Sequence, residues 1–469
     1  MAAEMRIFLE IPDKSIGFVV GETPLVNIHT FGFGEQTVQV RFLLNDPLGA
    51  TRFSLRDEER NLQSEHAVIS IPVELGADFP SGEYLITAQV ASESANFRAI
   101  ETESFHVVTP GDRLPDGFPV APGDHLVNPA FEFAPVEYGE LEEAFHLAHA
   151  ACLRSRNADG SWGKQNDGGK AAYRTPGNVT LGYLYAFEAL GASELQEMAI
   201  GGLNYLVSEQ EDSGAYRWWR EGYPEGVMNQ RDPFYDTGWA GLALAEGYRM
   251  TGDSRYLDAT RRAADWTLTC PYTGNNNYDA FALWFLSLLY EFTGEARYLD
   301  SAIDRTKHGV FFAQLPRGGW PGHNFHIGYQ SITVNGLSSL YDVLPLDHPF
   351  ALVLKKRLCM GLNFASFLQD TSGDYFQGWE YDRDFQINEQ GLPEGNSGQA
   401  RSELIRAFYI AENRLDLPEN IFNGLCQSIL RRVARLRQTP GADANHASLM
   451  DIGLLLLWAH KKQGQKTCP

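Results

Sequence analysis

The sequence predicts a multidomain protein: an N-terminal antiparallel β-sandwich of immunoglobulin-like type, followed by an all-α (α/α)6 toroid. Between residues 5 and 108, apolar and polar residues alternate, as in Val38, Val40 and Phe42, and this is the pattern of half-buried strands. Between residues 140 and 461 one unit recurs six times: an amphipathic helix, a polar loop, and a helix that is apolar on nearly every side. A closed ring of helical hairpins would bury every second helix, so the two patterns together define the fold class.

The sandwich is predicted from short alternating segments separated by turns. Ile69, Ile71 and Val73 form one such segment, and another follows the turn FPSGEY. Residues 109–135 are rich in Pro, Gly and Asp, and they are predicted to be a linker laid against both domains. We therefore divide the chain into a sandwich (1–108), a linker (109–135) and a catalytic toroid (136–465). The sandwich is expected to be a rigid accessory module, with glycan docking as the alternative role.

The helices of the toroid are assigned by their charged faces. The first helix of each unit has one charged face and is placed in the outer ring, near 141–154, 195–209, 255–268, 297–310, 350–368 and 419–437. The second helix is apolar all round and is placed inside, beginning near Asn178, Asp236, Asp279, Gly328, Asn396 and His446. Every loop that enters an inner helix then opens at the same end of the barrel. Function is expected in those six loops.

Composition limits the classes of partner. A length of 469 residues suits two domains, and the net charge of −22 excludes a nucleic acid, whose phosphates require a basic surface. A small basic patch for an acidic sugar is compatible with this charge. The chain has no 18-residue apolar run, and its five scattered cysteines lack the spacing of a metal site, so no membrane partner, metal or cofactor is predicted. The sequence suits a cytoplasmic protein, or a secreted or periplasmic one whose leader has been removed. The oligomeric state stays open.

Aromatic and charged residues gather in the predicted loops. An indole in water forfeits burial energy, so loop tryptophans indicate a partner such as a sugar ring, which is apolar on its face and hydroxylated at its edge. The alternative is that these rings plug the barrel mouth as part of the core. Basic side chains beside them would hold carboxylates. The residues predicted to bind substrate are Trp162, Arg174, Trp218, Trp219, Arg220, Trp320, Trp379, Glu380 and His446.

The segment GHNFHIGYQ places Asn324, His326 and Tyr329 at the mouth of the fourth inner helix. Removal of the C5 proton of a uronic acid needs a donor to the carboxylate, a base of near-neutral pKa and an acid for the leaving oxygen, and Asn, His and Tyr supply these. The three residues resemble the Asn, His and Tyr arrangement of toroid polysaccharide lyases. The resemblance implies β-elimination with His326 as base and Tyr329 as acid. A structural histidine is the alternative.

Asp236 and Asp279 form a competing set. Each opens an inner helix, and each is followed by a similar TG-x-x-RYLD turn. Residues 232–305 resemble unsaturated glucuronyl hydrolases, which implies that an Asp at such a helix mouth acts on an unsaturated uronide. Helix capping is the alternative role for each Asp. Loop acids near residue 380 could also supply a pair of carboxylates for ordinary glycoside hydrolysis.

Two further resemblances concern shorter segments. SITVNGLSSLYDV (331–343) is similar to a segment of glucuronyl C5-epimerases, and DGSWG and GGWPG look like the repeat of triterpene cyclases, without the DxDD motif of those enzymes. The sequence thus predicts a carbohydrate-active enzyme for a uronate-containing oligo- or polysaccharide. A polysaccharide lyase is favoured, a glycoside hydrolase comes second and an epimerase third. A non-catalytic glycan-binding protein is the remaining alternative.

Overall fold

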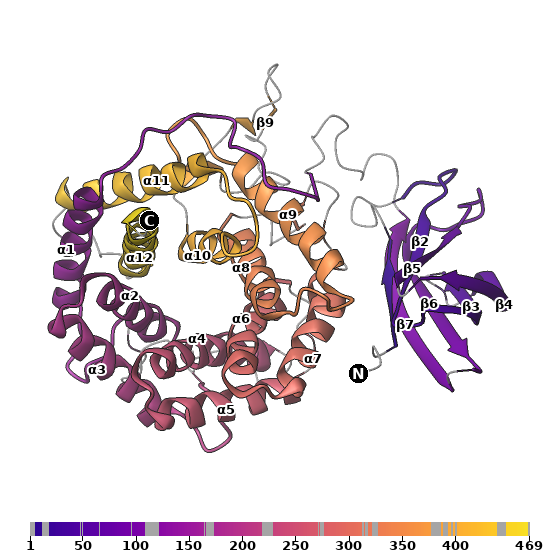
Figure 1. Cartoon of the computed structure of the whole chain (residues 1–469), viewed down its shortest axis with the longest axis horizontal. Helices are drawn as coiled ribbons and strands as arrows, with labels where there is room; N and C mark the ends of the chain where they lie inside the picture. The colour runs from indigo at the N-terminus through magenta and orange to yellow at the C-terminus, as the bar shows by residue number, and fades with distance from the viewer. Residues whose placement is uncertain are drawn as a thin grey trace.

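The computed structural model has antiparallel sheets at the N-terminus, followed by a helical body, which confirms this order as predicted (Figure 1). The structure describes residues 5–11, 18–46, 48, 50–64, 66–94, 96–107, 122–163, 165, 173–217, 228–270, 272, 276–311, 314, 318–320, 327–376, 386–387, 393–394, 397–398, 401–438 and 447–467.

The N-terminal region consists of two antiparallel sheets. One has the order β1(Arg6–Glu10), β2(Leu25–Phe31), β5(His66–Pro72). The other has the order β4(Thr51–Gln63), β3(Glu35–Asn45), β6(Gly82–Ser92), β7(Phe97–Val107). Alternating side chains such as Val26, Ile28, Phe42, Leu44 and Ile86 are fully buried and form a core separate from that of the helices. This burial follows directly from the period-two pattern of the sequence.

The helical body is a double ring (Figure 1). The outer helices are α1(Tyr138–Arg154), α3(Ser193–Glu209), α5(Ser254–Thr269), α7(Ala296–Arg305), α9(Ala351–Phe367) and α11(Glu419–Gln438). The inner helices are α2(Arg174–Leu190), α4(Met228–Thr251), α6(Asn276–Thr293), α8(Ile327–Val343), α10(Ser402–Ala411) and α12(Ala447–Thr467). The π-helix η3(Thr306–Val310) continues α7, and two short strand pairs, β8(Tyr375–Phe376) with β11(Ser397–Gly398) and β9(Gln386–Ile387) with β10(Pro393–Glu394), lie before α10. The expected start of the fifth inner helix near Asn396 is wrong, because α10 begins at Ser402.

One tight turn recurs after four outer helices. A side-chain nitrogen of Arg156, Gln210, Gln314 or Gln369 donates to the carbonyl of a glycine four residues later, at 3.2, 3.0, 2.9 and 3.0 Å. These four glycines have φ of +88°, +91°, +97° and +83°, a region that favours glycine. The residue two positions after each glycine is an aromatic one, and all four of these rings are at most 1% exposed: Trp162, Tyr216, Trp320 and Tyr375.

The segment before α1 lies along two outer helices. Asn363 on α9 donates to the carbonyls of Pro122 and His125 at 2.9 and 2.8 Å. Asn420 on α11 donates to the carbonyl of Phe131 and accepts from the amide of Phe133. The two asparagines therefore satisfy backbone groups of a segment that has no helix or strand of its own.

The sheets contact the outer ring directly. Phe8 of β1 packs edge-on against Phe350, with ring centroids 5.9 Å apart, and Arg357 of α9 lies 3.4 Å from Glu10. Glu101 of β7 lies 3.3 Å from His308 of η3. Burial alone would raise the pKa of Glu101, but its hydrogen bond to His308 and the nearby lysine charge outweigh burial and lower it.

The ring closes between its first and last helices. Figure 1 shows α12 beside α1 and α2, and the packing of these helices agrees. Gly182 on α2 faces the backbone of Met450, and Gly453 on α12 faces the carbonyl of Gly182. A Cβ atom at either glycine would meet backbone at under 3 Å, so the two helices touch through positions without side chains.

Candidate functional site

The N-terminal parts of the inner helices meet at one end of the barrel, called the mouth below. The expected start of the second inner helix near Asp236 is wrong, because α4 begins at Met228 and Asp236 lies in its third turn. Arg174 of α2 pairs with Asp236 of α4, and Tyr235 of α4 stacks on Tyr278 of α6. Ser402 of α10 bonds to Asp451 of α12. These contacts link residues that are far apart in the sequence.

The structure describes six of the predicted site residues: Trp162, Arg174, Asp236, Asp279, Trp320 and Tyr329. Eight others lie outside the described residues: Trp218, Trp219, Arg220, Asn324, His326, Trp379, Glu380 and His446. The pairing of His326 with Tyr329 therefore stays a prediction.

Asp236 and Arg174 form an ion pair at the mouth. Arg174 Nε lies 3.3 Å from Asp236 Oδ1, and the guanidinium stands 5.4 Å from the centroid of the Tyr235 ring. The two partners differ in access: Asp236 is fully buried, whereas the side chain of Arg174 keeps 32% of its surface exposed. The pair thus presents a cation outward with a carboxylate behind it.

An aromatic wall lies beside this pair. The rings of Tyr235 and Tyr278 stack at 5.1 Å with 28° between their planes, and both are half-buried. Behind them Trp239 packs against Phe281 at 4.8 Å and against Trp284 at 5.9 Å. The wall comes from α4 and α6, where aromatic residues recur at helical spacing. Ring faces of this kind suit the apolar face of a sugar.

Two buried amides near the mouth have unused hydrogen-bonding atoms. Asn178, one turn after Arg174 on α2, is 9% exposed, and its Oδ1 has no partner in the described structure. Asn277, next to Tyr278, is fully buried, and neither amide atom has a partner there. A buried polar atom without a partner costs free energy, so these amides are available to a hydroxylated ligand or to water.

Asp279 lies apart from this group, and its catalytic role stays a prediction. Its carboxylate is fully buried and bonds to Arg305 of α7 at 2.8 Å, on the outer side of α6. Arg305 also donates to the carbonyls of Thr267 and Cys270 at 3.1 and 2.6 Å. This arrangement joins three helices and leaves no face of the carboxylate open. Such a buried ion pair between helices is typical of a structural contact.

The predicted substrate contacts of Trp162 and Trp320 are not found in the structure. Both rings are fully buried, so the prediction that they stack on a substrate is wrong, and the alternative that they plug the core is right for them. Trp320 Nε1 donates to the carbonyl of Val310 at 2.8 Å. The guanidinium of Arg156 lies over the Trp162 ring, with its carbon 5.3 Å from the ring centroid. Both occupy the aromatic position of the recurring turn.

Tyr329 lies in the first turn of α8 and is half-buried. Its position at the mouth is compatible with the acid role predicted for it.

Glu403 was missed by the sequence analysis. It lies in the first turn of α10, and it is 8% exposed. Because the fifth inner helix was expected to begin near Asn396, position 403 seemed to lie inside the helix and not at its mouth. A correct helix start would have drawn attention to it.

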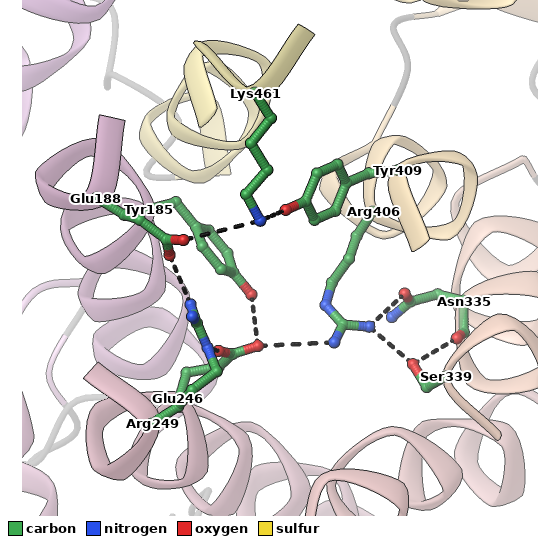
Figure 2. Close-up of polar contacts among 9 residues, drawn as sticks. All are labelled: Tyr185, Glu188, Glu246, Arg249, Asn335, Ser339, Arg406, Tyr409 and Lys461. Atoms are coloured by element: carbon green, nitrogen blue, oxygen red, sulfur yellow. Dashed lines mark hydrogen bonds and ion pairs between the residues drawn. The ribbon is translucent and has the colours of Figure 1, made fainter. Parts of the chain in front are cut away.

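A dense polar network lies farther along the inner helices and begins one turn after Glu403 on α10 (Figure 2). Arg406 of α10 reaches Ser339 Oγ at 2.7 Å, Asn335 Oδ1 at 3.2 Å and Glu246 Oε1 at 3.6 Å. Tyr185 Oη donates to the same Glu246 oxygen at 3.2 Å. The guanidinium of Arg406 also stands 4.1 Å from the centroid of a Trp284 ring. These contacts connect five inner helices, α2, α4, α6, α8 and α10.

The rest of the network balances the remaining charges. Arg249 contacts both Glu246 and Glu188 at 2.7 Å, and Lys461 lies between Glu188 and Tyr409 (Figure 2). Burial would raise the pKa of Glu246, but Arg249 and Arg406 outweigh burial and lower it. Mutual pairing of buried charges is typical of a structural network. We therefore place the candidate site at the mouth.

In the described part of the chain, no helix combines the length and hydrophobicity needed to cross a bilayer. The same residues contain no group of three or more His, Cys, Asp or Glu arranged to hold a metal ion.

The sequence matches no family model and no curated protein. Solved structures do resemble the chain. A family 88 glycosyl hydrolase from Bacteroides vulgatus is 13% identical over 70% of this chain and 99% of that one, with a TM-score of 0.50. A family 76 glycoside hydrolase from a bovine Bacteroides thetaiotaomicron strain is 12% identical over 97% and 98%, with a TM-score of 0.47. A polysaccharide lyase is 13% identical over 71% and 99%, also with a TM-score of 0.47. The predicted resemblance to toroid carbohydrate-active enzymes is confirmed at the level of fold.

Proposed function

We propose that this chain is a carbohydrate-active enzyme that hydrolyses a glycosidic bond in a uronate-containing oligo- or polysaccharide at the mouth of its inner ring. The observation that carries the proposal is the ion pair of Asp236 with Arg174 beside the stacked rings of Tyr235 and Tyr278. The fold agrees, since the neighbour with a TM-score of 0.50 is named a glycosyl hydrolase.

Each part of the site has a chemical use. Arg174 is the exposed member of its pair, and a guanidinium binds a carboxylate by charge-assisted hydrogen bonds, which suits a uronic acid. Binding of a substrate carboxylate would loosen the hold of Arg174 on Asp236. The freed carboxylate of Asp236 then serves as a base or nucleophile in glycoside hydrolysis. The aromatic wall supports the sugar face, and Asn178 offers a carbonyl oxygen to a hydroxyl group.

We also propose that the sheets form an immunoglobulin-like sandwich, that the helices form an (α/α)6 toroid, and that the two are separate domains. Two antiparallel sheets with a shared core support an immunoglobulin-like sandwich, and the alternation of outer and inner helices supports an (α/α)6 toroid. The end of β7 at Val107 and the start of α1 at Tyr138 support the proposed division into domains. The substrate roles of loop residues outside the described part remain part of the proposal: Trp218, Trp219, Arg220, Trp379, Glu380 and His446.

A second candidate is β-elimination on the same class of substrate. Its support is Tyr329, half-buried in the first turn of α8, where a phenol could protonate a leaving oxygen. In this reaction His326 would remove the C5 proton, and Asn324 would bind the carboxylate. Both of these residues lie outside the described part of the chain.

One experiment separates the two reactions. The protein is incubated with unsaturated uronyl oligosaccharides and, separately, with saturated uronate polysaccharides, while ultraviolet absorbance and reducing ends are followed. Hydrolysis yields reducing ends without a new chromophore, or removes the chromophore of the unsaturated oligomers. β-Elimination creates the chromophore. Binding without either change would reject both reactions and leave a glycan-binding protein.

A further inference from the structure

A second carboxyl group lies at the mouth in an environment opposite to that of Asp236. Glu403 is in the first turn of α10, two residues after the extended residue Arg401, and 8% of its surface is exposed. In the described structure no cation lies within ion-pair distance of its carboxyl group. A buried carboxyl group without a cation favours its neutral form, because burial penalises the charge.

The neighbours of Glu403 do not compensate for this burial. Asp451 of α12 adds negative charge, and the described cations whose charges oppose it are Arg401 and Arg432 of α11. Arg432 is already bound to Asp451, with 2.6 Å between Nη1 and Oδ2. Burial followed by the charge of Asp451 therefore raises the pKa of Glu403 to about 7, against the opposing effects of its own backbone amide and the two arginines.

Glu403 also belongs to the same group of residues as Asp236. Burial, followed by the negative charge of Glu403, raises the pKa of Tyr235 of α4. The Tyr235 ring lies under Arg174, and Tyr235 directly precedes Asp236 in the chain. Next to α10 on the other side, α8 carries Tyr329 at the same end. Among the described residues, the mouth thus combines a carboxylate held by a guanidinium with a carboxyl group that has no cation within ion-pair distance.

We propose that Glu403 is the proton donor of the reaction, working opposite Asp236. This inference rests on the proposed hydrolysis. As the bond between the anomeric carbon and the glycosidic oxygen breaks, that oxygen takes the proton of Glu403. Water adds to the anomeric carbon, and the proton lost by the water goes to Asp236. Two carboxyl groups whose surroundings separate their affinities for protons are what glycoside hydrolysis requires.

The first test compares leaving groups. Glu403→Gln keeps the shape of the side chain and removes its acid. On a natural disaccharide, kcat/KM should fall by roughly 10²–10⁴-fold. On a 4-nitrophenyl glycoside of the same sugar, whose leaving group needs little protonation, the loss should be about tenfold or less. Glu403→Asp should retain part of the activity on the disaccharide. Glu194→Gln, at an exposed position on α3, is the matched control and should behave like the wild type.

The pH profile supplies a second measurement. The wild-type kcat/KM should decline above about pH 7, as Glu403 loses its proton, and Glu403→Gln should lose this alkaline decline. An equal loss on both substrates with the decline retained would overturn the assignment, and so would full activity of Glu403→Gln. If the wild type cleaves no glycan, the proposed function falls together with this inference. If the wild type cleaves and only Glu403→Gln behaves unexpectedly, this inference falls alone.

Thermal unfolding gives a readout that does not depend on activity. A carboxyl group with a raised folded-state pKa contributes stability below its unfolded value, near 4.5, and this contribution is lost as pH rises toward about 7. Glutamine does not titrate. The Tm of Glu403→Gln relative to the wild type should therefore rise between these two pH values. A constant difference in Tm would show that Glu403 is already charged, which contradicts its role as an acid.

Discussion

The structure contains two Asp–Arg pairs in which the aspartate lies on an inner helix and directly follows a tyrosine. The two pairs differ in their surroundings. Asp236 pairs with Arg174 of another inner helix at 3.3 Å, and the arginine is 32% exposed. Asp279 pairs with Arg305 of an outer helix at 2.8 Å, and the arginine is 5% exposed. The first pair faces the mouth, whereas the second lies between the two rings. Similar sequence patterns therefore produced one candidate for chemistry and one structural contact, and the partner decides which.

The largest effect is expected at Asp236. Asp236→Asn should lower kcat/KM by roughly 10²–10⁴-fold, because the amide can neither accept a proton nor act as a nucleophile. Asp279→Asn should leave kcat/KM of the folded enzyme within about threefold, since the residue has no open face. Steady-state kinetics at a temperature well below both unfolding transitions makes the comparison. Equal kinetic losses in the two variants would erase the distinction between the pairs.

Replacing the arginine of each pair should have the opposite ranking: the loss in unfolding free energy should be larger at the Asp279 pair than at the Asp236 pair. Arg305→Met leaves the buried carboxylate of Asp279 without its cation and should cost about 3–5 kcal/mol in the free energy of unfolding. Arg174→Met should cost less than about 2 kcal/mol, because water can enter where Arg174 is exposed. Urea denaturation of both variants measures the difference. A larger cost at Arg174 would mean that the mouth pair is the structural one.

The smallest effect concerns the rings beside each pair. Tyr278→Ala should weaken binding of a uronate oligosaccharide by about 1–2 kcal/mol, because it removes half of the stacked pair at the mouth. Tyr272 is the matched control: it lies 5.7 Å from the guanidinium of Arg305 and is 46% exposed. Tyr272→Ala should leave the Kd unchanged. Calorimetric titration of both variants tests this, and weaker binding by Tyr272→Ala would place substrate on the outer side.

The double ring could be predicted from sequence because burial leaves a strong pattern. α6 is buried along almost its whole length, so nearly every position between Ala280 and Leu289 had to be apolar or small. The sheets were predicted for a related reason, since one face of each strand is buried.

The rest of the site could not be predicted, because it depends on partners remote in sequence. Nothing near Asp279 in the chain shows that Arg305 reaches it from α7. Trp162 and Trp320 were wrongly predicted to contact substrate because they lie in polar loops, where exposure is the usual expectation. A repeated spacing of Arg or Gln, then Gly, then an aromatic residue, at Arg156, Gln210, Gln314 and Gln369, was the signal that would have identified them as core.

The contact of α12 with α1 and α2 has a consequence for biosynthesis. Helices that emerge from the ribosome in order can pack on their immediate predecessors at once. The side of α2 that packs on α12 stays uncovered until the last helix of the ring has been made. Until then, the surface around Gly182 is uncovered. Ring closure is therefore a late step with a large loop-closure entropy, and a nascent chain stalled before Gly453 would be a natural client for chaperones.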